Sequence, residues 1–148
     1  PEAAIETEIL RLARERARET MGTAVQHARI PLSDVFAARA AVLDVHVAPA
    51  VERYLVELVL ASRTAQRYDA ALARRIAWGA SPRGSIALER CASAHAWLAG
   101  RDYVTPDDVR AIAPDVLRHR VLPSYEATAE GWDGDRLVAE LVRQVPLP

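Results

Sequence analysis

Hydrophobic and polar residues recur with the spacing of α-helices over most of this chain. Near its start, Ile5, Ile9 and Leu12 follow one another at intervals of four and three residues, with charged residues between them. This spacing places the apolar side chains on one face of an amphipathic helix. We expect that helix over residues 2–18, with Gly22 ending it.

The next two helices are indicated by their start signals. Ser33 can act as the N-cap of one helix, and Pro49 suits the first turn of another that runs to about Ser62. The apolar faces that these helices should turn inward are Val35, Phe36, Ala40 and Leu43 in the first and Val51, Tyr54, Leu55, Leu58 and Val59 in the second.

The middle of the chain begins with a less regular stretch. Residues 67–78 could form a short helix followed by a connector. A sharper start comes next, because Ser81 and Pro82 fit an N-cap and the first helical position. We expect this helix to run to about Ala99, with Gly100 as its C-terminal stop. Its core candidates are Ile86, Cys91, Ala94, Trp97 and Leu98.

A further helix start is indicated by Thr105 as N-cap and Pro106 in the first turn. Asp107 and Asp108 then lie at the positive end of the helix dipole, where acids are stabilising. This position makes capping a better account of the two acids than a general acid/base pair. The side chains expected to be buried after them are Val109 and Ile112.

The last part of the chain also reads as helical. Pro114 is expected to restart a helical segment, and a final helix should begin near Gly134 and be closed by Pro146. The apolar residues of these segments are Val116, Leu117 and Val121 in the first and Leu137, Val138, Leu141 and Val145 in the second. No run alternates apolar and polar residues over a useful length. The predicted fold class is therefore all-α, a small helical bundle.

Composition narrows the classes of function. The chain has 148 residues, of which 51% are apolar, so it can bury the core of one domain. Its net charge of −1 gives no reason to expect a nucleic-acid or membrane partner. A single cysteine excludes an internal disulfide, and no apolar run approaches the ~18 residues that a membrane span needs. We expect a cytoplasmic domain.

The segment Gly79-Ala80-Ser81-Pro82-Arg83-Gly84-Ser85 is the main candidate for chemistry. Two glycines bracket four residues as in a P-loop, but the chain contains no lysine, so a complete P-loop is excluded. Arg83 would lie in the first turn of a helix, where the dipole disfavours a cation by about 0.3–1 kcal/mol. That position suits an arginine that binds an external anion such as phosphate. An ordinary solvated arginine is the alternative.

Two other groups of residues have the composition of possible sites. Cys91 and His95 are four residues apart, a spacing found in zinc sites, but two ligands do not make a site. Arg118-His119-Arg120 can either complement the end of a helix or contact a phosphate or a partner. Residues 67–90 carry five arginines against two acids, whereas residues 126–148 carry five acids against two arginines. A local positive patch of this kind suits a single anion better than a DNA track.

The segment 79–85, opening a helix, resembles the sensor 2 region of MoxR-family AAA+ ATPases. Residues 100–109 resemble the stretch that follows it, and residues 116–120 resemble the end of the same lid domain. The likeness is best over about residues 45–125. Pro1-Glu2 with Glu6, Ile9 and Leu10 resembles the last helix of the ATPase core, which implies that residues 1–30 are the end of the core and a linker. Residues 31–148 would then be the helical lid.

The resemblance implies a function for the full-length parent. ATP and Mg²⁺ would bind between its core and this lid. Arg83 would be the sensor 2 arginine, acting electrostatically near the γ-phosphate, and Gly79, Ser81 and Pro82 would share the nucleotide site. No cofactor is expected for the fragment alone, because Walker A and Walker B are missing. The implied partners are the AAA+ core of the same protein, neighbouring subunits of a hexamer and a von Willebrand factor A-domain protein. The implied activity of the full-length protein is chaperone-like remodelling or assembly of client proteins.

One part of the sequence departs from this family pattern. Residues 67–78 are longer and more basic than the expected connector. The alternative function is a stand-alone helical protein-interaction module without nucleotide chemistry, whose positive patch holds an acidic partner. A helical DNA-binding domain is a weaker alternative, because the helices are balanced in charge.

Overall fold

The computed structural model describes residues 3–21 and 29–148. The chain divides into two compact units, residues 1–35 and residues 36–148. Gly22, which was expected to end the first helix, lies outside the described residues. Each unit is described by itself below.

The first unit contains helix α1 (Ala3–Met21), which confirms the first predicted helix. Its Ile5, Ile9 and Leu12 side chains are 52%, 56% and 43% exposed, so the apolar face of the helix is not buried. On the polar side, Arg11 pairs with Glu8 and Glu15 at 2.6 Å and 2.7 Å. Pairs at this spacing support an isolated helix by a few tenths of a kcal/mol each, roughly 0.2–0.5 kcal/mol.

Helix α2 (Leu32–Leu43) was predicted correctly as a helix but not in its cap or its buried face. The helix begins before Ser33, so this residue is not the N-cap, and its hydroxyl instead donates to Asp34 at 3.3 Å. The prediction that Val35, Phe36, Ala40 and Leu43 face inward is wrong, because all four are exposed. Apolar residues and alanines lie all round this helix, so their period does not select one face.

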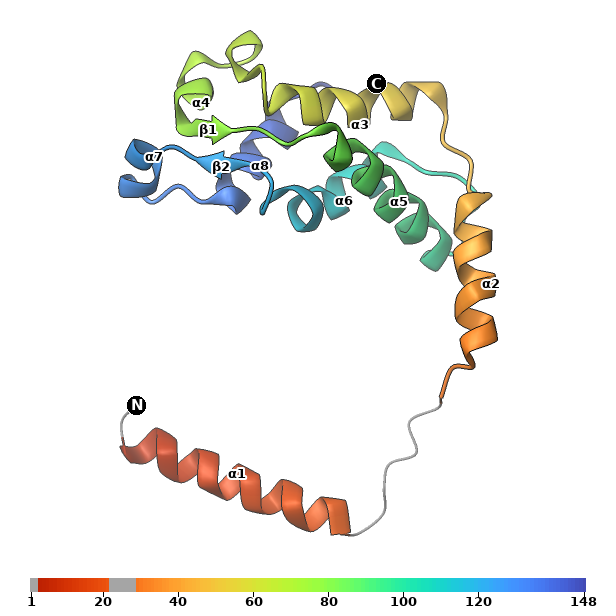
Figure 1. The fold of residues 1–148 in the computed structure, drawn as a ribbon, viewed down its shortest axis with the longest axis vertical. Helices are drawn as coiled ribbons and strands as arrows, with labels where there is room; N and C mark the ends of the chain where they lie inside the picture. Colours follow the sequence, from red (N-terminus) through yellow and green to blue (C-terminus); the bar gives the residue numbers. More distant parts are fainter. Residues whose placement is uncertain (1–2, 22–28) are drawn as a thin grey trace. The chain divides into compact units, whose positions relative to one another are not determined.

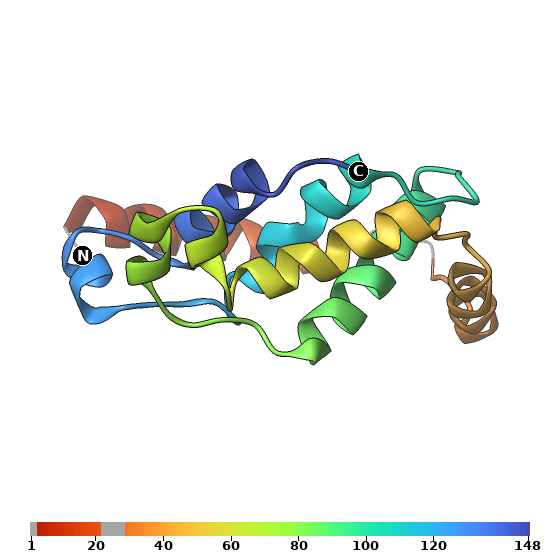
Figure 2. The ribbon, with the colours of Figure 1, turned by 90° about the horizontal axis from the view of Figure 1, so that it is seen from above.

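The second unit is a bundle of α3 (Pro49–Ala61), α5 (Pro82–Leu98), α6 (Pro106–Leu117) and α8 (Gly134–Gln144), as Figures 1 and 2 show. Helix α5 packs most extensively against α6, while α6 also packs against α8 and α3 packs against α5. The fully buried leucines of these four helices are Leu58, Leu88, Leu117, Leu137 and Leu141. The all-α fold class is confirmed.

The predicted faces of α3 and α8 are confirmed. The α3 face buries Val51, Tyr54, Leu55, Leu58 and Val59, and the α8 face with the residue after it buries Leu137, Val138, Leu141 and Val145. Asp133 caps α8, because its carboxylate accepts a hydrogen bond from the Arg136 N–H at 2.8 Å. In both helices the apolar period matches the buried stripe.

The predicted core face of α5 is wrong. Ile86, Cys91 and Leu98 are exposed, Trp97 is 37% exposed and Ala94 is only partly buried. The buried residues are instead Gly84, Leu88, Ala92, Ser93 and Ala96. Most of them are small, and small residues at four-residue intervals let α5 approach α3 and α6 closely. The bulky residues are consequently left on the outer face.

Pro114 does not restart a helix, because it lies inside the continuous helix α6. A proline there cannot donate a hydrogen bond to the carbonyl of Arg110, which normally weakens or kinks a helix. The helix nevertheless continues to Leu117, and Arg118 N–H donates to the Pro114 carbonyl at 3.0 Å. Val109, Val116, Leu117 and Val121 are buried as expected, and Ile112 is partly buried.

The irregular region before α5 contains a 3-10 turn η1 (Ala65–Arg67), a short helix α4 (Ala70–Arg75) and a strand β1 (Ile76–Trp78). This confirms a short helix followed by a connector. Strand β1 pairs antiparallel with β2 (Leu122–Pro123), which is followed by helix α7 (Tyr125–Ala129). These strands are too short to give an alternating pattern, so the sequence did not predict them.

Two loops are tied together at the opposite end of the bundle. The loop before α3 and the loop between α5 and α6 meet in a parallel bridge between His46 and Tyr103. His46 N–H donates to the Asp102 carbonyl at 2.8 Å, and Val104 N–H donates to the His46 carbonyl at 2.9 Å. Among the described residues, none of the helices is both long enough and apolar enough to span a membrane.

Candidate functional site

The start of α5 has the backbone that the sequence predicted. Ser81 is the N-cap residue with extended backbone angles, and Pro82 follows in the first turn. The Ser81 carbonyl accepts a hydrogen bond from Gly84 N–H at 2.7 Å. The Ser81 side chain makes no capping hydrogen bond, so its hydroxyl is not consumed by the helix. Pro82 has no N–H and the Gly84 N–H already donates to the Ser81 carbonyl, so the first turn of α5 satisfies part of its own backbone.

Arg83 lies exposed in the first turn of α5. Its guanidinium makes no hydrogen bond or ion pair with any residue in the described part of the chain. Other arginines of the bundle, such as Arg101 and Arg118, do pair with carboxylates. Arg83 is therefore a cation available to a group from outside these residues.

The loop that leads into α5 is fixed to the end of α3. The Ser62 hydroxyl accepts a hydrogen bond from Ala80 N–H at 2.9 Å and donates to the Val59 carbonyl at 2.7 Å. A Cβ placed on Gly79 would lie 2.5 Å from the Ser62 carbonyl oxygen. Gly79 is thus needed for close contact between the loop and α3, a reason for this glycine that holds whether or not a nucleotide binds nearby.

Gly84 has a similar packing role one turn later. It is buried, and a Cβ at this position would lie 3.3 Å from the Ala80 Cβ, 3.5 Å from Leu117 and 3.7 Å from Val59. The first turn of α5 is therefore held against both α3 and α6. The glycines of the P-loop-like segment are explained by packing of the protein on itself.

The outer face of α5 carries a mixed apolar and basic stripe. Arg83, Ile86, Arg90 and Trp97 are spaced by three, four and seven residues, so they lie on one side of the helix. This side is opposite the buried Leu88, Ala92 and Ala96. Aromatic residues and arginine together are enriched in protein interfaces, so the stripe is suited to contact with another surface.

A charged network that the sequence did not predict lies at the other end of α5. Asp108 caps α6 together with Thr105, which confirms the capping interpretation, but its carboxylate does more. Arg101 donates to both carboxylate oxygens at 2.5 Å and 2.7 Å, and His95 Nδ1 lies 2.7 Å from Oδ1. The Asp108 side chain is 1% exposed, so the charge is buried among these partners.

The electrostatics of Asp108 follow from this geometry. The hydrogen bonds from Arg101, together with those from Thr105 and His95, hold the pKa of Asp108 well below its usual range against the opposing effect of burial. His95 thus has a carboxylate partner at its Nδ1. No group of three His, Cys, Asp or Glu side chains in the described ranges is placed to hold a metal ion. Asp108 itself was visible in the sequence as a capping residue. Its partners His95 and Arg101 come from a different helix and a loop, so the sequence did not indicate the network.

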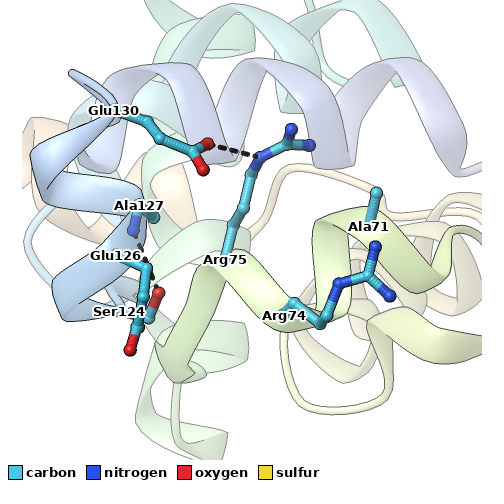
Figure 3. A pocket seen from close by; sticks show the side chains of 7 residues that line it. All are labelled: Ala71, Arg74, Arg75, Ser124, Glu126, Ala127 and Glu130. Carbon is cyan, nitrogen blue, oxygen red and sulfur yellow. Dashed lines mark hydrogen bonds and ion pairs between the residues drawn. The ribbon is translucent and has the colours of Figure 1, made fainter.

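A pocket of about 430 Å³ lies where α4 meets α7 (Figure 3). In Figure 3 Arg75 extends toward Glu130, at 3.8 Å, while Arg74 lies apart on the Ala71 side of the pocket. Arg75 also stacks on the Trp132 ring at 4.3 Å, which is a favourable cation–π contact. Arg75 is therefore held by internal contacts, and Arg74 has no side-chain partner among the described residues.

The basic run at the end of α6 is also held internally. Arg118 donates to Asp135 at 3.2 Å and pairs with Asp115, and Arg120 donates to the Val116 carbonyl. These contacts favour the interpretation that the run complements the end of a helix. They leave Arg118 and Arg120 less suited to an external phosphate than Arg83.

Comparisons with known proteins place this geometry in a family. The family model described as the AAA lid domain matches residues 68–141, which is half of the chain. MoxR of Methylorubrum extorquens is 35% identical over 133 residues, covering 85% of this chain and 33% of that protein. Chaperone MoxR1 of Mycobacterium tuberculosis is 36% identical over 96 residues, covering 64% of this chain and 26% of that protein.

A solved structure gives the same result in three dimensions. The crystal structure of a proposed ATPase from Cytophaga hutchinsonii matches with a TM-score of 0.83 and 32% identity, covering 99% of this chain and 44% of that one. The chain spans 33% and 26% of the lengths of the two curated relatives named above. It belongs to the AAA lid domain family and corresponds to the C-terminal lid region of a MoxR-family AAA+ ATPase.

Proposed function

We propose that this chain is the nucleotide-responsive lid of its parent ATPase and that Arg83 acts on the phosphates of bound ATP. The observation that carries the proposal is the placement of Arg83. It is exposed in the first turn of α5, it has no partner in the described part of the chain, and the backbone before it is anchored to α3. A cation held in this way, where the helix dipole disfavours it, fits an external anion.

The residues present fit a phosphate group in their chemistry. A guanidinium binds phosphate through two parallel hydrogen bonds and is always charged at neutral pH. In this proposal Arg83 offsets negative charge on the phosphate oxygens, which is worth most where water is excluded. The Ser81 hydroxyl, free of a capping bond, is a second polar group, and Gly79 and Pro82 set the path of the backbone.

Bound ATP with its Mg²⁺ would supply the bond that is hydrolysed and the metal charge that assists its cleavage. The described residues offer no cluster of metal ligands. We therefore assign the ligands of Mg²⁺ to the phosphates and to the ATPase core. The contribution of this chain would be to orient the phosphates and to follow the nucleotide state.

The same proposal includes the partners of the lid. Residues 1–30 would be the end of the ATPase core and a linker, and residues 31–148 the lid. The exposed stripe of Arg83, Ile86, Arg90 and Trp97 would face the core of the same protein or of a neighbouring subunit in a hexameric ring. Since one relative is named as a chaperone, we extend the proposal to remodelling of client proteins, with a von Willebrand factor A-domain protein as a further partner.

The test is steady-state ATPase activity of the full-length parent with Arg83→Ala, alongside a thermal melt. We expect hydrolysis to fall about tenfold or more, equivalent to about 1.4 kcal/mol of barrier, with an unchanged melting temperature. Arg53→Ala is the matched control, since Arg53 is exposed on α3, lies outside that stripe and also lacks a partner among the described residues. Equal loss in both variants, or no loss with Arg83→Ala, would refute the proposal.

A second candidate function, protein docking without nucleotide chemistry, is favoured by the surface around β1. Trp78 is 72% exposed and Tyr125 is 87% exposed, and Arg74 lies nearby without a partner in the described residues. Charge reversal at Arg74 in a pull-down with an acidic partner tests this function. Arg120→Glu is the comparison, because Arg120 is held by the end of α6. Loss of binding only with the Arg74 variant would support docking at this surface.

A further inference from the structure

We propose that Ser62 is a positioning residue for Arg83, acting through a hydrogen-bonded latch between the end of α3 and the start of α5. The inference rests on the proposed function, in which Arg83 acts on the phosphates of ATP. It names a residue that lies 21 positions before Arg83 in the sequence and outside the P-loop-like segment. Ser62 would act only through the loop that leads to Arg83.

The first observation is the hydrogen bonding of Ser62. Its side chain is buried, with 2% of the residue exposed, and its hydroxyl is used in both directions. It donates to the Val59 carbonyl within α3 at 2.7 Å and accepts from the Ala80 N–H at 2.9 Å. Ala80 is itself 1% exposed, so its N–H has no access to water. Without the Ser62 hydroxyl this buried donor would be left unpaired.

The second observation is the absence of free space beside the hydrogen bond. The Gly79 Cα packs so closely on the Ser62 backbone that a Cβ would lie 2.5 Å from its carbonyl oxygen. One residue further, Ala80 packs against Gly84 in the first turn of α5, where a Cβ on Gly84 would lie 3.3 Å from the Ala80 Cβ. The loop is thus held on both sides.

The third observation is the short, stiff link from the latch to Arg83. Only Ser81 and Pro82 separate Ala80 from Arg83. Pro82 fixes its own φ angle, and Arg83 already belongs to the helix. Only Ser81 lies between Ala80 and the first helical residue, so we infer that a shift of Ala80 is passed on to the Arg83 backbone over this short link. Conversely, a force on Arg83 from a bound phosphate is transmitted to α3 through Ser62.

The experiment is a double-mutant cycle in the full-length ATPase with Ser62→Ala, Arg83→Ala and the double variant. We expect Ser62→Ala to lower kcat about threefold to tenfold, equivalent to about 0.7–1.4 kcal/mol of barrier, in the presence of Arg83. In the Arg83→Ala background the same change should have no further effect on kcat. Such non-additivity is expected of residues that act as one unit, and a general loss of stability would not produce it.

Ser93→Ala is the matched control. Ser93 is another buried serine, 6% exposed, on α5 itself, and its side chain makes no hydrogen bond to the loop before Arg83. We expect its kcat to equal that of the wild type. Should Ser62→Ala unfold the enzyme at the assay temperature, the cycle is run with Ser62→Cys, which keeps the size of the side chain and weakens both hydrogen bonds.

The outcomes separate the two ideas. If Arg83→Ala lowers kcat but Ser62→Ala does not, or if the two effects simply multiply, the latch is refuted and the proposed function stands. If Arg83→Ala leaves kcat unchanged, the proposed function fails, and the latch fails with it. Loss of activity with Ser93→Ala of the same size as with Ser62→Ala would also overturn the inference.

Discussion

The two ends of α5 treat their charged side chains in opposite ways. At the C-terminal end, Arg101 and His95 both pair with the buried carboxylate of Asp108. At the N-terminal end, Arg83 is exposed without a partner among the described residues. One end of the helix thus pairs its charges within the bundle, while the other leaves the charge of Arg83 without a partner in the described part of the chain.

This comparison teaches where mutation should affect folding and where it should affect only activity. Breaking a buried ion pair by removing one partner leaves an uncompensated charge in the protein interior. Removing an exposed, unpaired arginine leaves nothing uncompensated. The predictions that follow run from the largest expected effect on stability to the smallest.

Arg101→Ala should have the largest effect. It leaves the carboxylate of Asp108, which is 1% exposed, without its main counter-ion. We expect a loss of about 3 kcal/mol in the free energy of unfolding, the lower part of the range for a broken buried pair. Urea denaturation of the chain measures it. A loss below about 0.5 kcal/mol, the range of ordinary surface changes, would show that the network does not stabilise the bundle.

Gly79→Ala should come next. The added methyl group would lie 2.5 Å from a backbone carbonyl oxygen, which cannot move aside cheaply. Forcing extra atoms into a packed site costs typically about 1–3 kcal/mol. Gly100→Ala is an informative comparison, because Gly100 has a φ of 74° but open space around its Cα. That variant should lose about 1 kcal/mol through backbone strain alone, and thermal melts compare the two.

Acid should weaken the Asp108 end of α5. The pKa of Asp108 is lower in the folded protein than in the unfolded chain, chiefly because of Arg101. Its contribution to stability is therefore fully present above the unfolded pKa of about 4 and is lost as the pH falls below that value. The melting temperature of Asp108→Asn should be lower than that of the wild type at pH 7, and the gap should narrow toward acid pH. A constant gap would contradict the assigned cause.

Arg83→Ala should have the smallest effect on stability, within about 0.5 kcal/mol of the wild type. Its side chain makes no contact with a carboxylate in the described ranges, and its removal from a helix N-terminus removes a mildly unfavourable charge. Equilibrium unfolding of the chain measures this. A loss of more than about 1 kcal/mol in the free energy of unfolding would contradict the difference between the two ends of α5, since Arg83 would then be a structural residue.

The sequence was most informative where helices begin and where large apolar residues are buried. Ser81, Thr105 and the prolines after them located the starts of α5 and α6. The large side chains of α3 and α8 defined their buried faces. In such helices the capping chemistry and the apolar period are local properties, so the sequence can display them without knowledge of the fold.

The errors concern properties that depend on neighbours distant in the sequence. The buried face of α5 consists mainly of small residues, such as Gly84 and Ala92, because two other helices approach it closely. Hydrophobicity alone favoured the bulky Ile86 and Leu98, which are exposed. Pro114 was predicted to restart a helical segment, but it lies inside the continuous helix α6, which packs against both α5 and α8.

The position of the candidate site was predictable from the sequence, but the contacts that hold it in place were not. The sequence placed Arg83 in the first turn of a helix, and the structure agrees. Ser62 could not be predicted, because its hydroxyl meets the N–H of Ala80, which lies 18 positions later in the sequence. The partners of Asp108 were missed for the same reason, since His95 and Arg101 come from a different helix and a loop.

The exposed thiol of Cys91 makes the outer side of α5 accessible to optical measurement. It is the single cysteine of this chain, so a thiol-reactive dye would attach at one defined position. That position lies eight residues after Arg83, which corresponds to about 12 Å along the helix axis. A dye there would be attached to α5, the same helix that carries Arg83. Under the proposed function, its emission in the full-length protein would report movement of α5 when a nucleotide binds or leaves.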